Sequence, residues 1–163
     1  MPKTSDNKDR HHIVASNRRA STQYEILETL EAGIVLTGPE VKSLRTGKAN
    51  LQDSFASVEN EQMLLMNMHI APYEMGSLHV HQEPTRTRRL LLNKAEIKKW
   101  MGRTILRGLT IVPLEIYFNK RGFAKVKLAL AKGRRGPDRR DDIKKKTINR
   151  EMQREFGGKH RVK

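Results

Sequence analysis

Cysteine is absent from the 163-residue sequence, which excludes a disulfide framework and a cysteine-ligated zinc site. No apolar run approaches the roughly 20 residues that a membrane-spanning helix needs. The first twelve residues, MPKTSDNKDRHH, are charged and lack the apolar segment of a secretory signal. We therefore expect a cytoplasmic protein that makes no use of a membrane.

Aromatic residues are scarce, with one Trp, three Tyr and four Phe, which argues against a protein that binds single strands mainly by base stacking. Enzyme signatures are also missing: there is no P-loop, no Rossmann glycine pattern, no G-x-S-x-G and no H-E-x-x-H. His79 and His81 share one face of a predicted strand, but two histidines without a third ligand make a weak metal site. We expect no catalytic activity, no cofactor and no metal.

Negative charge is the next shortage. The chain has 33 Lys and Arg against 18 Asp and Glu, a net charge of +15, and its pI is about 10.4. An excess of this size repels itself within a folded domain and favours a polyanionic partner, nucleic acid ahead of an acidic membrane. Residues 132–163 alone hold 13 Lys or Arg against 5 Asp or Glu, which is about half of the excess.

Three segments of different composition follow one another along the chain. Residues 1–12 are polar and unpatterned, which predicts a disordered arm. Residues 13–131 alternate apolar and polar side chains as strands do, which predicts a folded domain. Residues 132–163 form a basic tail.

Alternation and turn residues predict five or six strands and favour a small β-barrel. Gly33 predicts a kink or bulge in the first strand, and Pro113 an edge or bulge in a later one. The segment 59–61 predicts a hairpin turn. The predicted inner faces are Leu64, Met66, Met68 and Ile70 in one strand, Val112, Leu114, Ile116 and Phe118 in another, and Val126, Leu128 and Leu130 in a third.

Local signals also place two short helices. Pro39-Glu40 predicts a helix start, and Gly47 predicts its end about two turns later. Asn93 with Glu96 three residues on predicts the capped start of a second helix, which Gly102 is expected to end.

Basic residues of the folded domain are candidates for phosphate contact. Each group alone could be a solvated face, but together they indicate a surface that follows the backbone of a folded RNA. They are Asn17, Arg18 and Arg19 before the first predicted strand, Lys42, Arg45 and Lys48 along the first helix, Arg86 and Arg88 before the second helix, and Lys125 and Lys127 on the last strand.

Three stretches resemble the SsrA-binding proteins, also called small protein B, which partner transfer-messenger RNA in bacterial trans-translation. They are NRRASTQYEILETLEAGIVLTGPEVKSLRTGKANLQDSF, PTRTRRLLLN and KVKLALAKGRRGPDRRDDIKKK. The resemblance implies a mainly β fold: a small closed β-barrel of oligonucleotide-binding (OB) type with two or three short flanking helices and a basic C-terminal tail.

The resemblance also implies residues that contact the tRNA-like domain of this RNA, namely Glu31, Leu91 and Asn93. Glu31 could accept hydrogen bonds from a base edge or a ribose hydroxyl. Leu91 could pack on an exposed base or complete the core, and Asn93 could contact RNA or only cap its helix.

In the family the tail is disordered alone and forms a helix in the empty mRNA channel of a stalled ribosome. The residues assigned to this role are Lys132, Gly133, Arg134, Arg135, Asp138, Arg139, Arg140, Ile143, Lys144 and Lys145. Two i, i+4 pairs, 141 with 145 and 142 with 146, contribute about 0.2–0.5 kcal/mol each, far below the ordering cost of about 1–2 kcal/mol per residue. Where the family tail usually reads G-K-K-x-x-D-K-R, this one has Arg for each Lys, which keeps the charge.

The function implied by the resemblance is delivery of alanyl-charged transfer-messenger RNA to the decoding region of a stalled ribosome. Elongation factor Tu with GTP is an expected indirect partner, and the protein is expected to be a monomer. A basic structural protein of the ribosome is the alternative, and an RNA-modifying enzyme is third because no catalytic constellation is visible.

Overall fold

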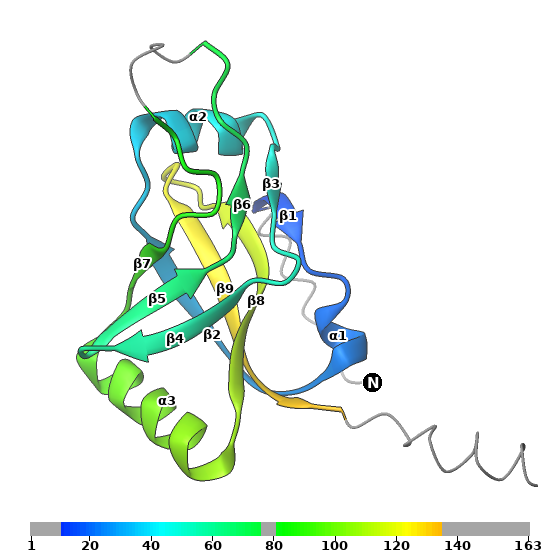
Figure 1. Ribbon diagram of the computed structural model, residues 1–163, viewed down its shortest axis with the longest axis vertical. Coiled ribbons are helices and arrows are strands. Elements are labelled where there is room, and N and C mark those ends of the chain that lie inside the picture. Colours follow the sequence, from blue (N-terminus) through cyan, green and yellow to red (C-terminus); the bar gives the residue numbers. More distant parts are fainter. Residues whose placement is uncertain (1–10, 76–80, 135–163) are drawn as a thin grey trace, which may run out of the picture. The chain divides into compact units, whose positions relative to one another are not determined.

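The computed structural model describes residues 11–75 and 81–134, so residues 1–10 of the predicted arm 1–12 and the tail from 135 onward lie outside the described residues. The predicted end of the arm is wrong, because His12 already begins strand β1. Nine strands and three helices occur within these ranges (Figure 1). They are β1 (His12–Ser16), α1 (Ala20–Gln23), β2 (Tyr24–Ile34), α2 (Gly38–Arg45), β3 (Ala49–Asn50), β4 (Phe55–Glu59), β5 (Gln62–Met66), β6 (His69–Ile70), β7 (Arg88–Leu91), α3 (Lys94–Arg107), β8 (Thr110–Phe118) and β9 (Ala124–Gly133).

The larger sheet closes on itself. Its strand order is β1-β8-β4-β5-β7-β2-β9, and β8 also pairs with β9, so β8, β4, β5, β7, β2 and β9 form a ring of antiparallel strands. Buried side chains from all six strands, with Trp100 and Ile97 of α3, make up the main core. The prediction of a mainly β fold is confirmed.

Several local predictions are confirmed because they depend on residues a few positions apart. The β4–β5 hairpin turns at Asn60 and Glu61, both with positive φ. Helix α2 has a capping box between Thr37 and Glu40, and Gly47 has φ +75° two residues beyond its end. Asn93 with Glu96 forms the capping box of α3.

The predicted inner faces are wrong wherever a strand is interrupted. A bulge between Pro113 and Glu115, which Pro113 had indicated, shifts β8 by one residue. Ile111 and Ile116 therefore share the main core, while Val112 belongs to a second, smaller cluster. One extra residue exchanges the two faces of a strand, so alternation cannot be extended across it.

The same effect occurs at Asn67, whose φ of +60° separates β5 from β6. Met63 and Leu65 are buried before this residue and Met68 and Ile70 after it. The predicted face is thus wrong for Leu64 and Met66, which are only partly buried.

The bulge in β2 lies between Ile26 and Glu28 and not at Gly33. Helix α3 continues through Gly102 and ends at Gly108, which has φ +61°. Glu28 binds both Lys99 and Arg103, one on each side of Gly102, and so ties this turn of the helix to β2.

The sequence reading also missed β1 and α1, so residues 17–19 follow the first strand and do not precede it. At the other end β9 reaches Gly133, two residues beyond the predicted boundary at Ala131. Lys132 and Gly133, assigned to the tail, pair with Glu25 and Tyr24 of β2.

Candidate nucleic-acid interface

Strand pairing brings four of the predicted contact residues onto one outer face of the ring. Gly33 lies opposite Leu91 of β7 on one side and opposite Lys125 of β9 on the other. Glu31, two residues earlier on β2, lies opposite Lys127. Residues directly opposite or two apart share a sheet face. We call Glu31, Leu91, Lys125 and Lys127 the Glu31 face.

The Glu31 carboxylate is held in a defined position. The hydroxyl of Tyr117 donates a hydrogen bond to its Oε2, and Lys125 Nζ lies 3.9 Å from its Oε1. Burial raises the pKa of Tyr117, and the hydrogen bond to Glu31 raises it further. The phenol therefore keeps its proton at neutral pH and remains a donor. The Glu31 side chain is 53% exposed, so Oε1 can accept a hydrogen bond from a ligand.

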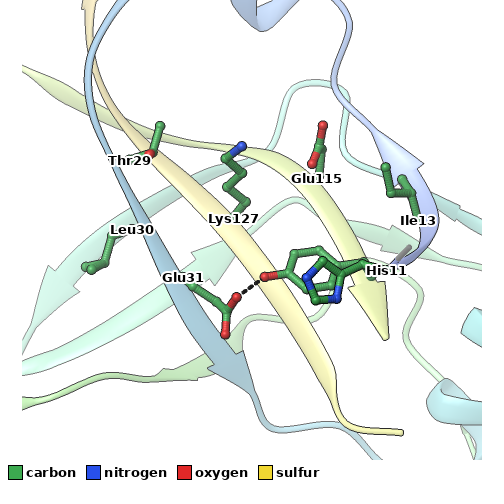
Figure 2. A pocket seen from close by; sticks show the side chains of 8 residues that line it. His11, Ile13, Thr29, Leu30, Glu31, Glu115 and Lys127 are labelled. Atoms are coloured by element: carbon green, nitrogen blue, oxygen red, sulfur yellow. Dashed lines mark hydrogen bonds between the residues drawn. The ribbon is translucent and has the colours of Figure 1, made fainter. Parts of the chain in front are cut away.

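An open cavity of about 500 Å³ lies beside this carboxylate (Figure 2). It is lined by His11, Ile13, Thr29, Leu30, Glu31, Glu115, Tyr117 and Lys127. The rings of His11 and Tyr117 are 4.9 Å apart at a tilt of 39°, so His11 covers the Tyr117 side of the cavity. Its walls thus offer carboxylate acceptors, an ammonium donor and aromatic surface.

Leu91 projects from this face with 51% of its surface exposed, so it does not complete the core. A Cβ at Gly33 would lie 3.2 Å from the Leu91 Cβ, closer than most such contacts. Glycine at position 33 therefore leaves room for Leu91 to lie over β2, on the Glu31 face. The exposed Leu91 side chain can pack on a base.

Arg86 and Arg88, on the segment before α3, were both predicted to contact RNA phosphates. For Arg88 this prediction is wrong. Its side chain is fully buried, and it donates hydrogen bonds to the carbonyls of Met68 and Pro84 and to Glu40 Oε1. A guanidinium in this position cannot reach a phosphate. Its neighbour Arg89, which the sequence reading passed over, is exposed and shares its side of β7 with Leu91.

Arg86 is engaged by the same carboxylate. Its Nε lies 2.8 Å from Glu40 Oε1 and its terminal nitrogen 2.6 Å from Oε2. Burial raises the pKa of Glu40, but hydrogen bonds from Arg86 and the Thr37 backbone and the charge of Arg88 outweigh it and lower the pKa. Arg86 is about one-third exposed, so it contributes charge to the surface but is not free to move.

Lys42 and Arg45 of α2 and Lys48, three residues beyond it, are exposed, and each has a neighbour. Lys42 Nζ lies 5.4 Å from the centre of the Tyr73 ring, and Arg45 lies 6.0 Å from that of Phe118. Lys48 forms a 2.9 Å ion pair with Glu74. Phe118 is the last residue of β8, so the Arg45 contact places this end of α2 at the end of the ring where β8 ends.

The remaining predicted residues lie elsewhere or have structural roles. Asn17 donates its amide to the Pro113 carbonyl at 3.3 Å and so supports the bulge of β8. Arg18 and Arg19 are exposed next to α1, at the start of β2, roughly 20 Å along the strand from Glu31. Asn93 is exposed while it caps α3, so its two readings are compatible.

Arg134 is exposed just after β9. The other tail residues, from Arg135 to Lys145, lie outside the described residues, as does His79. Within residues 11–75 and 81–134 no three His, Asp or Glu side chains are grouped to hold a metal ion. No helix in this described part of the chain is long and apolar enough to cross a membrane.

Comparison with known proteins gives consistent results. The family model of the SmpB protein matches residues 14–158. SsrA-binding proteins of Pelotomaculum thermopropionicum and Moorella thermoacetica are 58% and 51% identical, over 87% and 92% of this chain and 92% and 96% of their own length. A chain from the solved structure "tmRNA-SmpB: a journey to the center of the bacterial ribosome" is 50% identical, with a TM-score of 0.64 over 83% of this chain and 94% of that one. The chain therefore belongs to the SmpB protein family.

Proposed function

We propose that this chain binds the tRNA-like domain of transfer-messenger RNA and delivers that RNA to stalled ribosomes for trans-translation. The observation that carries the proposal is the match, over 87% of the chain, to a relative named SsrA-binding protein. The similar chain in the tmRNA–SmpB structure of the bacterial ribosome supports the ribosome as second partner.

The Glu31 face supplies the chemistry that such binding needs. Lys125, Lys127 and the cations of α2 can neutralise phosphates, which provides affinity that depends on salt. The oriented Glu31 carboxylate can accept a hydrogen bond from a ribose hydroxyl or a base edge, and Leu91 can pack on an unstacked base. Shape, backbone and hydroxyl contacts of this kind are typical of the recognition of folded RNA.

Finer parts of the proposal concern the fold type and the tail. The closed ring of antiparallel strands in the described residues supports a small β-barrel, and we propose that this barrel is of OB type. We further propose that the tail enters the mRNA channel next to the decoding region, and that its charge serves contact with ribosomal RNA. The protein acts in the cytoplasm as a monomer in this scheme, and elongation factor Tu with GTP joins through the charged RNA.

Purification of the tagged chain followed by sequencing of the bound RNA tests the proposal. We expect transfer-messenger RNA to be enriched over transfer RNA and ribosomal RNA, and the purified chain to shift its tRNA-like domain in a gel. Retention of the chain on ribosomes in equal numbers after a high-salt wash, with no such RNA bound, would instead identify a structural ribosomal protein.

A further inference from the structure

The hairpin that joins β8 to β9 carries an exposed aromatic side chain. Phe123 is 63% exposed, while Phe118, the other phenylalanine of this hairpin, packs against the core. The contact of Phe118 with Arg45 places the tip at the α2 end of the ring (Figure 1). Burial in the core therefore does not account for the phenylalanine at position 123.

The backbone at this position is firmly held. Asn119 Oδ1 accepts hydrogen bonds from the backbone N–H of Arg121 and of Phe123, at 3.0 and 2.9 Å. The Asn119 N–H donates to the Phe123 carbonyl at 2.9 Å, and Gly122 turns the chain with φ +80°. A ring on a rigid support loses little conformational freedom when a flat ligand stacks on it.

Positive charge surrounds the ring and leads from it to the Glu31 face. Arg121 is exposed two residues before Phe123, and Lys125, two residues after it, is partly exposed. Phe123 directly precedes β9, and the hydrogen bond from the Asn119 N–H to its carbonyl continues the pairing of the hairpin. Alternation then places Phe123 on the same side as Lys125 and Lys127. A polyanion that follows the two lysines would thus pass over the phenyl ring.

We propose that Phe123 is a stacking site for one unpaired nucleobase of the bound RNA, next to the phosphates that Lys125 and Lys127 contact. Stacking of a base on an aromatic ring is tolerant of sequence and adds affinity that does not depend on counterion release. The inference rests on the proposed function, because it requires that the chain bind a folded RNA.

Binding of the full chain to the tRNA-like domain, measured over a range of salt, tests the site. Phe123→Ala is expected to weaken binding about tenfold with an unchanged salt slope, whereas Lys125→Ala should lower that slope by about one. Phe123→Trp should bind at least as well as the wild type. Leu106→Ala, which truncates an 85% exposed side chain on α3, is the control and should have no effect.

Fluorescent 2-aminopurine at each unpaired position of the RNA identifies the base. One position should be quenched by the wild type and not by Phe123→Ala. If Phe123→Leu binds like the wild type, only apolar contact matters and stacking is refuted. Equal affinity of Phe123→Ala and wild type refutes the site and leaves the proposed function standing. A wild-type chain that binds no such RNA overturns both.

Discussion

Removal of the Glu31 carboxylate separates specific recognition from charge attraction. Glu31 adds a negative charge to a basic face, so an attraction governed by charge alone predicts that Glu31→Ala binds RNA more tightly. A carboxylate that is held by Tyr117 and accepts a hydrogen bond from RNA predicts the opposite result.

The two predictions also differ in magnitude. Relief of one repulsion at about 6 Å in water contributes about 0.7 kcal/mol, which is roughly threefold tighter binding. Loss of a hydrogen bond to a charged acceptor costs about 1.5–3 kcal/mol, which weakens binding about 10- to 150-fold. We expect the second result, because the Glu31 side chain is about half exposed and its other carboxylate oxygen, Oε2, already accepts the Tyr117 hydroxyl.

Titration calorimetry of the full chain with the tRNA-like domain measures this difference. Glu25→Ala removes the same charge from the same strand, six residues before Glu31, and is the matched control. Tyr117→Phe, which removes only the donor that orients the carboxylate, should lose less than Glu31→Ala. Binding by Glu31→Ala that is as tight as wild type, at an unchanged melting temperature, would refute the specific role.

Three further predictions follow from the same structure. Arg88→Ala should lower the free energy of unfolding in urea by roughly 3–5 kcal/mol, because it breaks a buried ion pair. Arg89→Ala should change that free energy by less than about 0.5 kcal/mol but weaken RNA binding. Equal stability of the two variants would contradict the burial of Arg88. Residues 1–134 should bind the tRNA-like domain nearly as well as the full chain in gel shifts. Loss of specific binding on truncation would disprove the proposal that the folded domain binds this RNA without the tail. Alanine at the three charged positions 138–140 should abolish peptide tagging on stalled ribosomes but not RNA binding. Ile143→Pro should reduce tagging more than Ile143→Ala, because Pro costs a helix about 3 kcal/mol or more. A Pro variant that tags like the wild type would rule out a helical tail.

Much of this protein was predictable from its sequence because the relevant interactions are local. Glu40 lies three residues after Thr37, and Glu96 three after Asn93, so both helix starts are visible in a short window. Alternation places Val126 and Leu128 inside correctly, because β9 is not interrupted between them. The excess of positive charge and the three stretches that resemble SsrA-binding proteins are likewise visible in the sequence without knowledge of the fold.

Tertiary structure decided which face of an interrupted strand is inside and which polar groups meet. Single inserted residues in β2 and β8 exchange the faces of those strands, and alternation carries no mark of the exchange. Arg88 is buried and Arg89 exposed because Glu40, 48 residues away from Arg88, supplies the buried partner. Glu31 likewise gains its orientation from Tyr117, 86 residues along the chain. Such pairs form only when the ring closes, so the sequence determined the residue types available for RNA contact, and the closed sheet determined which of them share a surface.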